Sequence, residues 1–144
     1  MTMDESRAQN LKSWESRVDV HAGSRMYDLD GMVSGAKQFS DVFAYDVEPL
    51  GDVVGLDTVH LQCHIGTDTV SLARLGARVT GLDFSPAALE VARDLAARCG
   101  VDARFVEAEL YGAVDALGRE QFDLVYTGVG SLGWLPDITG WARV

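Results

Sequence analysis

The chain has 144 residues, of which 47% are hydrophobic and 24% charged, and its formal net charge is −10. This length and composition are typical of one globular domain with a substantial core. The acidic balance argues against general binding to nucleic acid or to an anionic membrane surface, both of which need a surplus of Lys and Arg, so a small molecule or a specific protein is the expected partner.

The amino terminus lacks the basic and apolar segments of a signal peptide, and no apolar stretch in the sequence is long enough to cross a bilayer. The two cysteines, Cys63 and Cys99, then indicate a reducing compartment and no disulfide framework. We therefore expect a cytoplasmic protein with free thiols.

The first 56 residues read as mostly helical. Apolar residues recur at helical spacing at Leu11, Trp14 and Val18, and a break follows at 21–24. Residues 26–35 contain two glycines and are predicted to form a loop. A second apolar stripe runs over 39–50.

From residue 57 the pattern changes to strands that alternate with helices. Strands are predicted over 58–63, 78–82, 103–107 and 122–126. Helices are predicted over 67–75, from Pro86 with Ser85 as the N-cap, and after Pro136. This alternation predicts an α/β fold with right-handed crossovers, a mostly parallel sheet and helices on both faces.

Ligands of such sheets bind beyond the carboxyl ends of the strands. In this sequence the residues at those ends are 63–66, 83–85, 107–110 and 126–130. We expect these four segments to converge on one rim.

Asp83 ends the second predicted strand, about twenty residues after the first turn, where a carboxylate can accept hydrogen bonds from both ribose hydroxyls. The alternative is an aspartate favoured there by the following helix start. Phe84 is placed either against a purine or in the core. Glu109 is placed either to meet an adenine amino group or to face solvent, and the backbone N–H of Leu110 is a candidate donor to a ring nitrogen.

The sequence lacks the residues that several other kinds of functional site require. His60 and His64 have no cysteine or carboxylate at metal-motif spacing, so no metal site is expected, and His64 either lines the pocket or has a structural role. Neither a hydrolase elbow nor a phosphate-binding loop with its lysine is present. The turn at 62–66 carries side chains where a dinucleotide pyrophosphate needs close backbone approach, which argues against a nicotinamide or flavin enzyme.

Two segments carry a family resemblance. Residues 61–74 read LQCHIGTDTVSLAR and residues 76–85 read GARVTGLDFS. They resemble the class I S-adenosylmethionine-dependent methyltransferases, and most of all a subgroup whose first motif reads Leu-Gln-Cys-His. Residues 122–128 and 134–137 resemble the fourth-strand motif of the same family.

The resemblance implies a Rossmann-like methyltransferase fold with S-adenosylmethionine as the cofactor. It assigns cofactor contacts to Gln62, His64, Gly66, Asp83, Phe84, Glu109, Leu110, Thr127 and Gly128. The resemblance implies that the turn at 62–66 holds the methionine part of the cofactor. Residues at the ends of the next two strands, 83–84 and 109–110, would hold the ribose and the adenine. Thr127 and Gly128 would lie near the sulfonium end. His60 departs from the family, because many members have an acidic residue there that helps to hold the cofactor's ammonium group.

The leading hypothesis is a methyltransferase that acts on a small-molecule acceptor, with small or cationic acceptors favoured by the acidic charge. No catalytic residue is assigned; His64 and His21 are the candidates for a base. The alternatives are an inactive fragment, a module that only binds cofactor or protein, and a nicotinamide-dependent oxidoreductase.

One domain is expected over 1–144, with a helical lid at 1–56 that carries Trp14 and Tyr27, and a cofactor-binding half at 57–144. Members of the resembled family have seven strands, so we expect the C-terminal strands to be missing here. The fourth strand would then form a sheet edge that invites pairing with a second copy of the chain.

Overall fold

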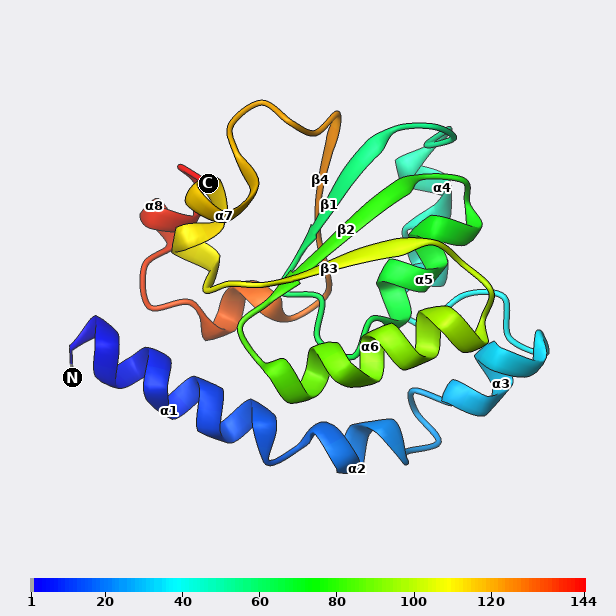
Figure 1. Ribbon diagram of the computed structural model, residues 1–144, viewed down its shortest axis with the longest axis horizontal. Coiled ribbons are helices and arrows are strands. Elements are labelled where there is room, and N and C mark those ends of the chain that lie inside the picture. Colours follow the sequence, from blue (N-terminus) through cyan, green and yellow to red (C-terminus); the bar gives the residue numbers. More distant parts are fainter. Residues whose placement is uncertain (1) are drawn as a thin grey trace.

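The computed structural model describes residues 2–144 as an α/β fold around a parallel four-stranded sheet (Figure 1). The strands are β1 (Asp57–Leu61), β2 (Arg78–Asp83), β3 (Ala103–Glu107) and β4 (Leu124–Thr127). They lie in the order β3-β2-β1-β4, and every neighbouring pair is parallel. The carboxyl ends of all four strands therefore lie on one edge of the sheet.

Helices cover both faces of the sheet. On one face lie α5 (Thr67–Arg74) and α6 (Pro86–Arg98), and on the other η2 (Leu110–Gly112), α7 (Ala113–Leu117), η3 (Ser131–Trp134) and α8 (Ile138–Trp141). Leu72 of α5 packs against Val79 of β2, whereas Ala113 of α7 packs against Val59 of β1. The expected Rossmann-like fold class is confirmed.

The second half of the chain follows its local signals closely. Ser85 caps α6 by accepting a hydrogen bond from the Ala88 N–H at 3.1 Å, and Pro86 occupies the first helical position. Gly76 follows α5 with a φ of +93°, a conformation that favours glycine. The first three strands match the predicted ranges to within two residues, and the fourth begins two residues late.

The N-terminal segment consists of short elements that the sequence predicted less well. These are α1 (Met3–Glu15), α2 (Val18–Ala22), α3 (Leu29–Ser34), η1 (Phe43–Tyr45) and α4 (Val47–Leu50). In Figure 1, α2 lies below α6, and α1 extends from α2 toward the N-terminus at the left. The predicted loop at 26–35 is wrong, because Asp28 caps α3 and the side chain of Met32 anchors it in the core. The stripe at 39–50 yields only η1 and α4, since Phe43 alone is fully buried and the chain leaves helical geometry at Gly51.

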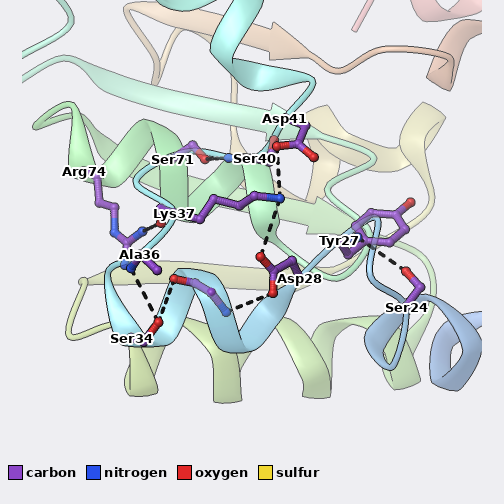
Figure 2. Close-up of polar contacts among 11 residues, drawn as sticks. Ser24, Tyr27, Asp28, Ser34, Ala36, Lys37, Ser40, Asp41, Ser71 and Arg74 are labelled. Carbon is purple, nitrogen blue, oxygen red and sulfur yellow. Dashed lines mark hydrogen bonds and ion pairs between the residues drawn. The ribbon is translucent and has the colours of Figure 1, made fainter.

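Polar contacts attach residues 32–40 to α5, and Figure 2 shows those of Arg74 with Lys37 and of Ser71 with Ser40. The guanidinium of Arg74 donates hydrogen bonds to the carbonyl oxygens of Met32, Lys37 and Gln38. The Ser40 N–H donates to Ser71 Oγ at 3.0 Å. These contacts fix Ser40 beside α5.

Among residues 2–144, no helix combines the length and the apolar character that crossing a bilayer requires.

Candidate functional site

A cavity of about 360 Å³ opens at the carboxyl-end edge of the sheet. Residues that follow all four strands line it, so the predicted convergence of the strand ends is confirmed. Seven of the nine residues expected to contact the cofactor are in its lining: Gln62, His64, Asp83, Phe84, Glu109, Leu110 and Gly128. Gly66 and Thr127 are not. Side chains of α1 and of the segment after α2 complete the walls, among them Asn10, Trp14 and Tyr27.

The Asp83 carboxylate is buried and held by two backbone groups. Its side chain lies at the end of β2, and the residue is 6% exposed. Oδ2 accepts a hydrogen bond from the His64 N–H at 2.8 Å, and Oδ1 accepts one from the Ser85 N–H at 2.9 Å. Burial raises the pKa of Asp83, and these backbone hydrogen bonds oppose that rise. Each carboxylate oxygen has two acceptor sites, so both can still receive a ligand hydroxyl.

The turn after β1 keeps the backbone shape of a glycine turn although side chains replace the glycines. Gln62 has a φ of +57° and His64 a φ of +50°, both in the left-handed region that few non-glycine residues adopt. Gly66 has a φ of +80°, and a Cβ there would lie 2.7 Å from the Ala92 Cβ of α6. In this structure Gly66 thus serves the close approach of the turn to α6.

His64 joins the turn to the N-terminal helices. Its Nε2 lies 2.8 Å from Nδ1 of His21, and its ring meets Trp14 edge-on with 4.9 Å between the ring centroids. Burial, with a contribution from the nearby His21, lowers the pKa of His64 to about 4. Burial also lowers the pKa of His21. Both rings are therefore mainly neutral at pH 7. Two neutral rings can form this hydrogen bond when one of the two facing nitrogens carries a proton and the other accepts it.

Glu109 is partly engaged by its own surroundings. Oε2 accepts a hydrogen bond from the Tyr111 N–H at 2.9 Å, which caps η2, and Oε1 lies 3.4 Å from Nε of Arg7 in α1. Leu110 beside it is buried. The carboxylate thus links the end of β3 to α1 at the cavity wall.

Sequence reasoning missed two polar residues of the site, Asp68 and Ser40. Asp68 lies in the first turn of α5, is 9% exposed and lines the cavity. Its Oδ1 accepts a hydrogen bond from Ser40 Oγ. The available signal was the polar Thr67-Asp68-Thr69 run at a helix start, which is buried here although such residues are usually exposed.

Within the described residues, no group of three or more His, Cys, Asp or Glu side chains is arranged to hold a metal ion. Cys63 and Cys99 are both free thiols.

Comparisons with known proteins agree with this arrangement. Residues 59–143, more than half of the chain, match the family described as methyltransferase domain. A ubiquinone biosynthesis O-methyltransferase of Serratia proteamaculans (strain 568) is 29% identical over 133 residues, which are 92% of this chain and 54% of the relative. The chain spans about half the length of the curated relatives it matches, or less.

Solved structures give the same result. An S-adenosylmethionine-dependent methyltransferase from Mesorhizobium loti has a TM-score of 0.51 and 30% identity, with 69% of this chain and 40% of that chain covered. The complex of DhpI with SAH has a TM-score of 0.55 and 25% identity, with 87% of this chain and 52% of that chain covered.

Proposed function

Since this chain belongs to the family of S-adenosylmethionine-dependent methyltransferases, we propose that it binds this cofactor in the rim cavity and transfers the methyl group to a small-molecule acceptor. In the same proposal, residues 57–144 form the cofactor-binding half, residues 1–56 form a lid over the cavity, and the protein acts in the cytoplasm.

One observation carries the assignment of the site. The Asp83 carboxylate is buried at the end of β2 with both oxygens oriented by backbone N–H groups. A fixed acceptor pair of this kind suits two adjacent hydroxyls, such as those of a ribose. The other six lining residues that are expected to contact the cofactor share one cavity with this carboxylate, which supports the assignment of all seven as cofactor-binding residues.

The residues fit an adenosyl ligand that has no pyrophosphate. The left-handed turn at Gln62 and His64 carries side chains at the cavity, which a pyrophosphate would not tolerate but a methionine tail can. The cofactor, when bound, supplies a methyl group already activated on a sulfonium. The protein then has to align an acceptor with that methyl and exclude water, and Trp14 and Tyr27 in the lining are suited to the second task.

Two facts support a small acceptor. The cavity contains the acidic residues Asp41, Asp68, Asp83 and Glu109 but, among the described residues, Arg7 as the one lysine or arginine in its lining. The similar curated proteins are named as O-methyltransferases of ubiquinone biosynthesis, which is a small-molecule pathway by its name. A hydroxyl acceptor must lose a proton, and the imidazoles of His21 and His64, whose pKa values are lowered, are the candidates to take it.

The proposal is tested by calorimetric titration with S-adenosylmethionine and S-adenosylhomocysteine. The wild-type chain should bind both, and Asp83→Ala should weaken both by about 100-fold or more, because two hydrogen bonds to a charged acceptor are lost. A folded wild-type chain that binds neither ligand would overturn the proposed function.

The matched control is Glu107→Gln, which neutralises an exposed carboxylate at the register position opposite Asp83 in β3. It should leave both affinities unchanged. Thermal melting of each variant separates lost ligand contacts from lost folding. Asp83→Ala protein that stays folded and still binds tightly contradicts the assignment of Asp83.

A further inference from the structure

Asp68 is a buried carboxylate in the cavity that none of the assignments above uses. It is the second residue of α5 and is 9% exposed. Burial is the main cause that raises its pKa, and the nearby Asp46 raises it further, while the Ser40 and Thr67 hydroxyls lower it. In the part of the chain that the structure describes, no Lys or Arg nitrogen lies within 4.0 Å of this carboxylate. A buried negative charge without a cation is costly, and a cationic ligand group would offset that cost.

The orientation of Asp68 is fixed from the N-terminal segment. The Ser40 hydroxyl donates a hydrogen bond to Asp68 Oδ1. Ser40 Oγ in turn accepts a hydrogen bond from the Phe43 N–H at 3.2 Å. The backbone of Ser40 is itself bound to Ser71, and its segment is attached to α5 through Arg74 (Figure 2). The carboxylate is thus held toward the cavity by several contacts that do not depend on a ligand.

The free side of the carboxylate points toward the end of β4. A Cβ placed on Gly128 would lie 3.2 Å from Asp68 Oδ2 and 3.6 Å from His60 Nε2. His60 is 3% exposed, and burial lowers its pKa to about 3, so its ring is neutral and cannot neutralise Asp68. All three residues line the cavity. They form a small polar corner with one negative charge and no positive charge of its own.

The sheet order places this corner across the β1 turn from Asp83. Asp83 ends β2, Gly128 follows β4, and β1 lies between those two strands. A ligand with its ribose at Asp83 and its tail along the turn at Gln62 would have the end of that tail on the side of this corner, since all of these residues line one cavity. In S-adenosylmethionine this end carries an α-ammonium group.

We propose that Asp68 is the residue that binds the α-ammonium group of the cofactor, in place of the acidic residue that His60 replaces at the end of β1. This inference rests on the proposed function and adds a specific anchor to it. Because the anchor recognises the amino group and not the nucleoside, its contribution should vanish for a ligand without that group.

The experiment compares S-adenosylhomocysteine with its deaminated analogue, in which hydrogen replaces the α-amino group. By calorimetry, the wild-type chain should bind S-adenosylhomocysteine about 10- to 100-fold more tightly than the analogue, as expected for a hydrogen bond between charged groups. Asp68→Asn should lose that preference by weakening S-adenosylhomocysteine alone. Unchanged binding of S-adenosylhomocysteine, or an equal loss for both ligands, would overturn the inference.

Two further variants complete the design. Glu107→Gln, which removes an exposed carboxylate outside the cavity lining, should affect neither ligand. Ser40→Ala keeps the charge but removes the orienting hydroxyl, and should cause a smaller loss for S-adenosylhomocysteine alone. If Asp68→Asn does not fold, the Ser40→Ala variant tests the inference instead. An equal effect of Ser40→Ala on both ligands, or no effect on either, would contradict the binding of the α-ammonium group by Asp68. Failure of the proposed function gives a different result, namely no binding of S-adenosylhomocysteine by the wild-type chain.

Discussion

At the scale of single residues, His60 shows how burial fixes a protonation state. Its ring is enclosed between β1 and α5, with Nδ1 2.9 Å from Thr69 Oγ1 and the ring of Tyr126 edge-on at 5.0 Å. Burial lowers its pKa from 6.5 to about 3. The unfolded chain therefore binds a proton at this residue in a pH range where the folded chain does not, and stability falls as the pH falls below 6.5.

We expect the free energy of unfolding to lose about 2 kcal/mol through His60 between pH 7.5 and pH 5, given these two pKa values. The measurement is urea denaturation of the wild type and of His60→Gln at both pH values. Asp68 and Asp83 have raised pKa values and act in the opposite sense, because the folded chain retains their protons. Both chains share these carboxylates, so the difference between the chains reports His60. An equal pH dependence in the two chains would contradict this prediction.

At the scale of secondary-structure elements, the approach of α6 to the β1 turn depends on Gly66. A Cβ at this position would meet the Ala92 Cβ at 2.7 Å and the Ala92 Cα at 3.2 Å, and the φ of +80° already disfavours a side chain. Gly66→Ala should therefore destabilise the fold by two causes, left-handed strain of about 1–2 kcal/mol and overpacking of about 1–3 kcal/mol.

Gly100→Ala separates the two causes. Gly100 has a φ of +66°, but no atom outside its immediate neighbours lies within 4 Å of a Cβ built on it. It should show the strain alone, so Gly66→Ala is expected to cost at least about 1 kcal/mol more in urea denaturation. Equal destabilisation by the two substitutions would mean that α6 moves away without cost.

The elements that the sequence predicted well are those whose ends carry local signals. Ser85 and Pro86 start α6, and Gly76 follows α5, so these boundaries follow from neighbouring residues. The N-terminal elements were predicted poorly. Helix α3 forms where Met32 packs into the core, and no pattern in the neighbouring sequence predicts that contact. Likewise the partner of Asp68 lies 28 residues earlier in the chain, at Ser40, and only the fold brings the two together.

At the scale of the whole molecule, α1 is attached mainly around the cavity. None of its residues is buried. It contacts the rest of the chain through a hydrogen bond from Asn10 Nδ2 to the Trp134 carbonyl at 2.9 Å, through Arg7 at 3.4 Å from Glu109, and through the ring of Trp14 against His64. Arg7, Asn10 and Trp14 also line the cavity. A helix held by so few buried contacts has low local stability, and a ligand that fills the cavity adds contacts to it.

We therefore expect S-adenosylhomocysteine to slow amide hydrogen exchange in α1 by about 10-fold or more, because ligand binding to the closed form stabilises it against local opening. Hydrogen-exchange mass spectrometry of the chain with and without the ligand makes the comparison. Helix α6 provides the internal reference, since it packs on β3 through its own buried face and lies outside the cavity lining. The Asp83→Ala variant at the same ligand concentration provides the second control and should show no protection. Protection that is equal in α1 and α6 would mean that the ligand stabilises the fold as a whole, whereas protection confined to α1 and the lining turns means that the N-terminal helices close over the cofactor.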